Sequence, residues 1–105
     1  MTFTKTSKED LTQELVAKVL RYDATTGTLT WLTNLHSKRV IPNSRAGSLV
    51  STTGYRNITL FGRNYLEHHL IWFIYYGVWP MAQLDHIDQV RDNNRINNLR
   101  EVTVS

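Results

Sequence analysis

The sequence contains no cysteine, and this absence removes several kinds of chemistry. Without a thiol the chain can form no disulfide, use no thiolate nucleophile and bind no zinc ion through cysteine ligands. Long apolar runs are also missing, because Leu70 to Tyr76 is far shorter than the roughly 18 residues that span a bilayer. No secretory signal pattern is present either. We therefore expect a soluble protein of a reducing compartment such as the cytoplasm, with no membrane partner.

Acidic residues are absent from a long internal segment between Asp23 and Glu67. The same segment holds these cations: Lys38, Arg39, Arg45, Arg56 and Arg63. The whole chain has a formal net charge of +3. A segment with this bias attracts phosphates and can bind nucleic acid in a salt-dependent way. An ordinary solvated basic surface fits the charge equally well, so charge alone leaves the choice open.

The size of the chain favours one small domain. It has 105 residues, of which 41% are hydrophobic, and its three Trp, five Tyr and three Phe compensate for a modest core. No repeat, low-complexity tract or linker is visible. We expect a single compact α+β domain over residues 1–105. Its parts would be an N-terminal helix, short strand and basic loop in 1–45, a sheet with a helix in 46–80, and a chemistry-bearing motif in 81–105.

Local patterns in the first half predict one helix followed by a short strand. Ser7 can cap a helix in which Asp10 is the third residue, and apolar residues then repeat at helical spacing as far as Leu20. Residues 22–31 form a turn leading into a strand, in which Leu29 and Trp31 alternate with threonines. Residues 34–45 lack periodicity, and we predict a loop there.

The second half predicts a small antiparallel sheet, a helix and a second strand pair. Three strands are expected at 48–51, 55–61 and 64–65, with Arg56, Ile58 and Leu60 on one face of the middle strand. The helix covers 66–76, and Gly77 is placed to end it. A strand through 84–86, a loop over 88–92, a helical turn near 93–98 and an extended segment over 100–103 follow.

The most informative segment is Leu84 to Thr103, LDHIDQVRDNNRINNLREVT. It places Asp85 next to His86, and Asn98 follows twelve residues later (98 − 86). An isolated Asp-His pair is most simply a solvated loop pair, so its spacing to Asn94-Arg95 and to Asn98-Leu99-Arg100 is what suggests a function. Neighbours in a regular strand point to opposite faces. Both side chains therefore reach one site only if the strand bends or ends at Asp85-His86, and we predict such a break.

This segment resembles the motif of the HNH nucleases, in particular the small phage and homing endonucleases. The resemblance also covers most of the chain upstream. The matching positions are Tyr22-Asp23, Gly27 to Trp31, Ala46-Gly47, Gly54-Tyr55, Gly62-Arg63, His68 to Phe73 and Trp79-Pro80.

The resemblance implies a metal-dependent DNA endonuclease that leaves a 5′-phosphate and a 3′-hydroxyl, by nicking or by cutting both strands. Asp85 would hold one Mg²⁺ or Mn²⁺, and His86 would be the general base. Asn98 would order the loop that carries His86, and Asn94 would help to structure it. The upstream cations named above would contact DNA. A phage protein of this type would act in the cytoplasm of a bacterial host.

The resemblance also implies a further metal ligand, a His or Asn a few residues beyond the Arg-Glu-Val-Thr segment, where this sequence reaches Ser105. A shortened relative, a truncated product, or a substitute ligand from Asp88, Asp92 or a partner subunit would each account for this. The alternative function is a catalytically inactive DNA-binding remnant of such an enzyme. A third is a small interaction protein whose basic face binds an acidic partner. His68-His69 is expected to have a core or surface role, because adjacent helix residues point about 100° apart.

Overall fold

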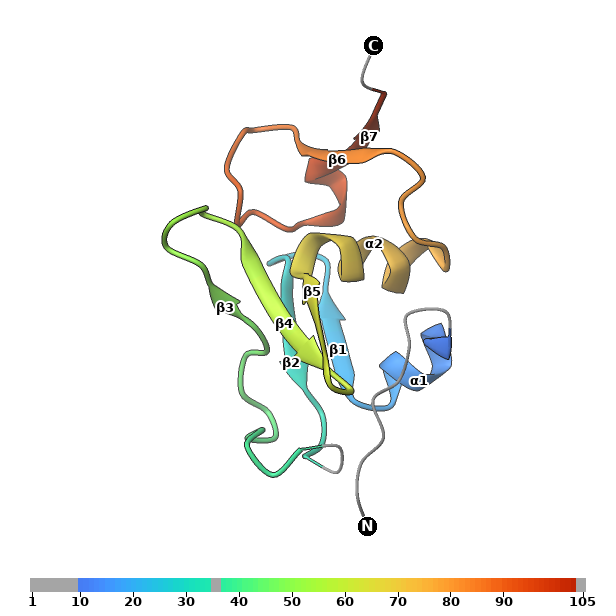
Figure 1. Cartoon of the computed structure of the whole chain (residues 1–105), viewed down its shortest axis with the longest axis vertical. Helices are drawn as coiled ribbons and strands as arrows, with labels where there is room; N and C mark the ends of the chain where they lie inside the picture. The colour runs from blue at the N-terminus through green and yellow to red at the C-terminus, as the bar shows by residue number, and fades with distance from the viewer. Residues whose placement is uncertain (1–9, 35–36, 104–105) are drawn as a thin grey trace.

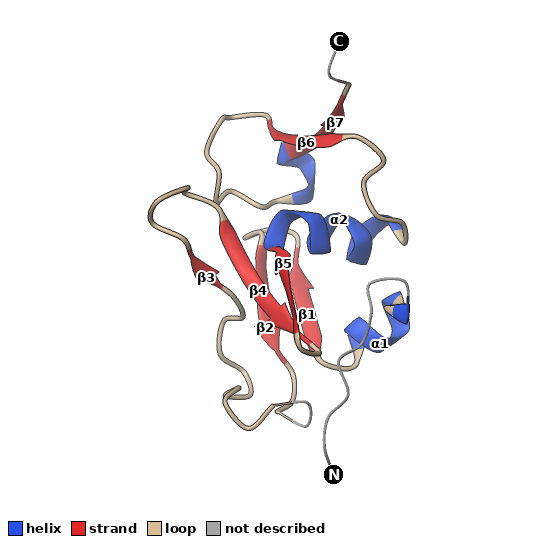
Figure 2. Ribbon diagram, in the orientation of Figure 1, coloured by secondary structure: helices blue, strands red, loops and turns tan. Residues whose placement is uncertain are grey.

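The computed structural model describes residues 10–34 and 37–103, which form an α+β fold as predicted (Figure 1). Within these residues, the strands form three small antiparallel sheets, ordered β1-β2, β3-β4-β5 and β6-β7. The longest helix, α2, lies between the β6-β7 pair on one side and the other two sheets on the opposite side (Figures 1 and 2). No described helix is long and apolar enough to cross a membrane.

The N-terminal helix is shorter than predicted. Helix α1 covers Gln13–Ala17, and its cap is Thr12, whose hydroxyl oxygen accepts a hydrogen bond from the Leu15 backbone N–H at 3.1 Å. The predicted cap, Ser7, lies outside the described residues. Leu20 belongs to strand β1 (Leu20–Asp23), which pairs with β2 (Thr28–Trp31). The strand predicted around Leu29 is therefore confirmed, but its partner strand was missed because Leu20 also fits the helical spacing.

The predicted three-stranded sheet is present as β3 (Ser48–Leu49), β4 (Arg56–Leu60) and β5 (Arg63–Leu66). In β4 the residues Arg56, Ile58 and Leu60 are all buried, whereas Thr59 is exposed. One face of this strand therefore packs into the interior, as alternation requires.

Helix α2 (Glu67–Tyr76) follows β5 directly and supplies much of the core. Leu70 and Ile71 have no exposed surface, and they share the core with Leu29 and Leu60, which are equally buried. Burial of each such side chain stabilises the fold by about 1.5–3 kcal/mol. Gly77 ends the helix in the left-handed conformation with φ of 80°, as its position in the sequence predicted.

The C-terminal part consists of β6 (Gln83–His86), a 3₁₀ turn over Ile96–Asn98 and β7 (Leu99–Val102). Asp85 pairs with Arg100, and His86, the last residue of β6, pairs with Leu99. The Ile87 N–H then donates to the Asn98 carbonyl at 2.8 Å. The predicted order of strand, loop, helical turn and strand is confirmed, and the loop over residues 87–95 is held between the two strands.

Candidate active site

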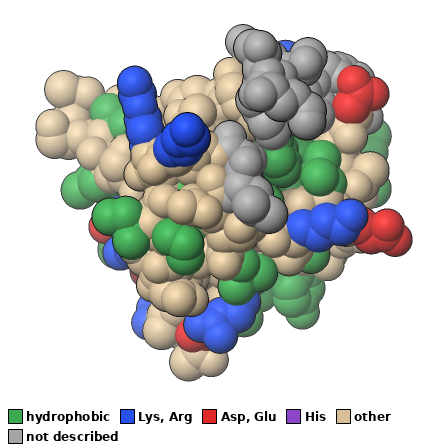
Figure 3. Space-filling view, turned by 90° about the horizontal axis from the view of Figure 1, so that it is seen from below, with side chains coloured by type: hydrophobic (Ala, Val, Ile, Leu, Met, Phe, Trp, Pro, Cys, Tyr) green, Lys and Arg blue, Asp and Glu red, His purple; other side chains and the backbone are tan. Residues whose placement is uncertain are grey.

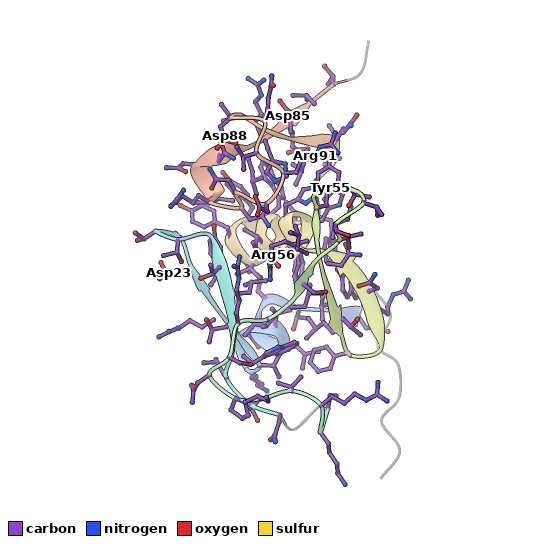
Figure 4. The ribbon with its side chains drawn as sticks, turned by 90° about the vertical axis from the view of Figure 1, so that its left-hand side faces the viewer. Asp23, Tyr55, Arg56, Asp85, Asp88 and Arg91 are labelled. Atoms are coloured by element: carbon purple, nitrogen blue, oxygen red, sulfur yellow. The ribbon has the colours of Figure 1, made fainter. Side chains whose placement is uncertain are left out.

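Asp85 and His86 line the same cavity at the end of β6. It has a volume of about 370 Å³ and is bounded by polar side chains, including those of Tyr55, Gln89 and Arg91. Tyr55, Asp85 and Arg91 lie at the same end of the molecule (Figure 4). Strand β6 ends at His86, as the sequence predicted, and Gln83 and Leu84 line the cavity together with Asp85 and His86.

The His86 ring is buried, with only 4% of the residue exposed. Its Nε2 atom lies 2.8 Å from Oδ1 of Asn94. The His68 ring centroid is 4.7 Å from that of His86, and the Tyr55 centroid is 6.0 Å away. A hydrogen bond on one ring nitrogen and rings against its sides fix the orientation of the imidazole.

Asn94 is itself held from two directions. Its side-chain nitrogen lies 3.4 Å from Oε1 of Glu67, and its backbone carbonyl accepts a hydrogen bond of 2.7 Å from the Tyr22 hydroxyl. Burial is the main cause that raises the pKa of Tyr22 to about 12. The turn between β1 and β2 also packs tightly here, because a Cβ on Gly27 would lie 2.6 Å from the Arg95 nitrogen. Asn94 is therefore anchored through both its backbone and its side chain.

Glu67 forms a buried ion pair with Arg56. Arg56 Nε lies 2.9 Å from Oε2 of Glu67, and the side-chain exposures are 10% and 0%. Arg56 Nη2 also donates to the Ala46 carbonyl at 3.3 Å. The prediction that Arg56 contacts DNA was therefore wrong, because its guanidinium is inside the protein and already paired.

Asn98 ties the loop to itself. Its amide nitrogen donates to Asp88 Oδ1 and to the Asn93 carbonyl, each at 2.9 Å, and its Oδ1 accepts from the Asp88 N–H at 3.1 Å. These bonds span the loop that follows His86, which is the geometry that the expected loop-ordering role requires.

Asp88 is engaged in the same loop through both carboxylate oxygens. Oδ1 also accepts from the Val90 N–H at 2.9 Å, and Oδ2 accepts from the Asn93 side chain at 2.6 Å. The hydrogen bond from Asn93 is the main cause that lowers the pKa of Asp88. A substitute role for Asp88 as a metal ligand would therefore compete with the bonds that order the loop.

The Asp85 carboxylate is the site's accessible anion, with 42% of its side chain exposed. Arg100 approaches only Oδ2, at 3.0 Å from Nη2 and 3.2 Å from Nε. Residues 10–34 and 37–103 contain no group of three His, Cys, Asp or Glu side chains that could hold a metal ion.

Three of the predicted DNA contacts, Lys38, Arg39 and Arg45, are exposed, and Arg63 is partly exposed. The loop that follows β2 lies at the opposite end of the molecule from β6 and β7 (Figure 1). Figure 3 shows Lys and Arg side chains on the face seen from that end. Arg39 and Arg45 line a separate cavity of about 680 Å³. This cavity is larger than the one at Asp85, but it contains none of the residues suited to hydrolysis.

Three residues of the site were missed from the sequence: Arg91, Tyr55 and Glu67. The Arg91 guanidinium carbon lies 5.0 Å from the Tyr55 ring centroid, and its Nη1 donates to the Thr53 carbonyl at 2.7 Å. For Arg91, the only available signal in the sequence was that a cation lies inside the motif. Glu67 precedes the helix's apolar residues, and nothing in its local pattern indicates burial.

Comparison with known proteins supports the resemblance seen in the sequence. Residues 65–105 match the family described as HNH endonuclease. None of the curated proteins and none of the solved structures is similar enough to the chain to match it. The matched segment contains Glu67, Asp85, His86, Asn94 and Asn98. Over residues 65–105 the chain is therefore similar to the HNH endonuclease family.

Proposed function

We propose that the chain is a metal-dependent endonuclease of the phage or homing type that hydrolyses DNA phosphodiester bonds. The observation that carries the proposal is the buried His86 ring, held by Asn94 at 2.8 Å and placed beside Asp85 at one polar cavity. A fixed imidazole next to an accessible carboxylate suits proton removal from water at a phosphate.

In this reaction His86 takes a proton from the attacking water as the water oxygen bonds to phosphorus. The bond from phosphorus to the 3′ oxygen breaks, and this oxygen takes up a proton from solvent, which leaves a 5′-phosphate and a 3′-hydroxyl. The Asn94 hydrogen bond leaves one ring nitrogen free to act, and the loop bonds of Asn98 keep the ring's surroundings in place. Positioning of this kind lowers the barrier because the base needs no reorganisation during the reaction.

Asp85 is the residue suited to hold Mg²⁺ or Mn²⁺, since both cations prefer oxygen ligands. When bound, the ion would supply charge stabilisation at the phosphate. The Arg100 contact with Asp85 is a surface ion pair, which contributes little to stability. Its rearrangement on cation binding would therefore cost little.

DNA binding is assigned to two regions. Arg91 borders the Asp85 cavity and is suited to contact a phosphate there. Lys38, Arg39, Arg45 and Arg63 provide a second basic region near the other end.

A catalytically inactive DNA-binding module is the second candidate function. It is favoured by the absence of a three-ligand metal group from the part of the chain that the structure describes. Incubation of supercoiled plasmid with Mg²⁺ or Mn²⁺, with a chelator control, distinguishes the two. The endonuclease predicts metal-dependent nicking. Salt-dependent binding without nicking would establish the inactive module, and absence of DNA binding would exclude both.

A further inference from the structure

We propose that the buried ion pair of Arg56 and Glu67 selects the tautomer of His86 through the side-chain amide of Asn94. The neutral ring then carries its hydrogen on Nε2, and Nδ1 is the nitrogen that accepts the proton from water. The catalytic consequence rests on the proposed function, whereas the tautomer is a property of the chain without metal or DNA. Arg56, Glu67 and Asn94 are positioning residues in this account.

The four side chains form one continuous chain of contacts. Arg56 Nε lies 2.9 Å from Glu67 Oε2, Glu67 Oε1 lies 3.4 Å from Asn94 Nδ2, and Asn94 Oδ1 lies 2.8 Å from His86 Nε2. All four residues are buried, with exposures of 8%, 0%, 1% and 4% in that order. The contacts connect β4, the start of α2, the loop before the 3₁₀ turn and the end of β6.

The direction of each contact follows from which groups can donate. A guanidinium only donates, so the Glu67 carboxylate faces Arg56 as an acceptor. A carboxylate only accepts, so the Asn94 amide must turn its NH₂ group toward Glu67. The 3.4 Å contact is long for a hydrogen bond, but the reversed amide would place Oδ1 against a carboxylate oxygen with no donor between them.

The amide orientation then determines the state of the ring. Asn94 presents Oδ1 to His86, and an amide oxygen can only accept a hydrogen bond. His86 Nε2 must therefore carry the hydrogen. A neutral imidazole has one N–H, so the lone pair available for proton transfer is on Nδ1.

The surroundings of the ion pair support a role beyond packing. A buried ion pair costs desolvation energy and is weak evidence for stability by itself. Here the backbone makes room for it, because a Cβ on Gly47 would lie 2.6 Å from Glu67 Oε2. The Ala46 carbonyl accepts from Arg56, and Tyr22 holds the Asn94 carbonyl. These contacts fix the positions of the ion pair and of the Asn94 amide relative to each other.

Glu67→Gln is the decisive substitution because it changes hydrogen-bond direction with little change in shape. Arg56 still requires an acceptor, so the oxygen of the introduced amide faces Arg56 and the NH₂ group of that amide faces Asn94. Asn94 must then offer its oxygen to the introduced amide and its own NH₂ to His86. The ring accepts at Nε2 and moves its hydrogen to Nδ1, which removes the lone pair from the proposed base.

A second substitution, at Asn94 in the same series of contacts, should reverse this effect. With Asn94→Asp added to Glu67→Gln, the new carboxylate accepts both from the introduced amide and from His86 Nε2. The ring returns to the original tautomer, and the net charge of the buried group is unchanged. Ile71→Val is the control, because it loosens packing in the same helix without altering a polar contact.

The test is ¹⁵N NMR of the His86 ring nitrogens in the full chain, without metal, at about pH 8.5, where ordinary histidines are neutral. We expect hydrogen on Nε2 in the wild type, in Ile71→Val and in the double variant, and hydrogen on Nδ1 in Glu67→Gln. A wild-type ring with hydrogen on Nδ1 overturns the proposal, even if Glu67→Gln fails to fold. A folded Glu67→Gln protein with hydrogen on Nε2 also overturns it.

Activity provides the second readout. The single-turnover nicking rate of Glu67→Gln should fall at least about tenfold at unchanged DNA affinity, because a positioned general base contributes about 10²–10⁴-fold. The double variant should recover most of the lost rate. A rate that stays low would count against the proposed coupling of Glu67, Asn94 and His86. If the wild type shows hydrogen on Nε2 but nicks no DNA, the proposed function fails while the tautomer assignment stands.

Discussion

His86 Nε2 and Asn94 Oδ1 lie 2.8 Å apart in the interior, eight residues apart in the chain. This contact joins the end of β6 to the loop that returns to β7. It makes the orientation of the ring depend on how the loop is ordered. Residues distant from the cavity should therefore affect activity through the loop, and variants can separate that effect from DNA binding.

Substitution of Asn98 by alanine should loosen this loop. The change removes three hydrogen bonds of a buried residue and leaves the Asp88 N–H without this partner. We expect the free energy of unfolding to fall by about 2–3 kcal/mol, and the nicking rate to fall with it. Urea denaturation measures the first effect. Asn97→Ala is the matched control, because Asn97 is exposed. Equal stability of the two variants would contradict the loop-ordering role.

Acid should destabilise the fold through His68. Burial is the main cause that lowers the pKa of His68 from 6.5 to about 3. The unfolded chain therefore takes up a proton near pH 6.5 that the folded chain excludes, so stability falls as pH drops below that value. Between pH 7 and pH 5 this group should cost about 2 kcal/mol. Urea denaturation at both pH values measures the fall in unfolding free energy from pH 7 to pH 5. This fall should be smaller by that amount in His68→Phe than in the wild type. The same drop in both proteins would contradict the assignment.

Arg91 should contribute to DNA affinity at the cavity. Arg91→Ala removes a cation next to Asp85, so the slope of log affinity against log salt should decrease by about one. Fluorescence anisotropy with a labelled duplex measures this slope. Arg21→Ala, a change of an exposed residue in β1, is the control for net charge. An equal effect of both variants would show that Arg91 acts only through overall charge.

The basic region and the buried arginine should behave differently. Arg45→Ala should lower DNA affinity and the salt slope without a large change in stability, since Arg45 is exposed. Arg56→Met should instead cost about 3–5 kcal/mol in unfolding free energy, because it leaves the Glu67 carboxylate buried without its cation. Urea denaturation and anisotropy on both variants test this. A lower salt slope in a folded, fully stable Arg56→Met protein would restore Arg56 as a DNA contact.

Much of the fold was predictable because local chemistry specifies it. Gly77 ends α2, and the turns that contain residues 53–54 and Gly62 separate the strands of the central sheet. The spacing from Asp85-His86 to Asn98 also placed the loop correctly, since its ends are fixed by the β6-β7 register. Strand β1 was missed because its partner, β2, decides its conformation and the local spacing of Leu20 does not.

The buried residues that hold Asn94 and His86 were harder to predict from the sequence, because they depend on contacts between distant segments. Alternation in β4 already placed Arg56 on the same face as Ile58 and Leu60, but its charge favoured a DNA role over burial. Glu67 could not be recognised without its partners, since Arg56 is 11 residues away and Asn94 is 27 residues away. Burial of a charge is decided by the partner that neutralises it.

We assign His86 as the base of a DNA-cleaving site, and the single-turnover nicking rate of supercoiled plasmid decides this claim. With Mg²⁺ or Mn²⁺ present, His86→Ala should lower the wild-type rate about 10²–10⁴-fold while DNA affinity is retained. Val90→Ala, an exposed change in the same loop, should leave the rate unchanged. A wild-type protein that binds DNA without nicking it, or nicking that survives in His86→Ala, would contradict the claim.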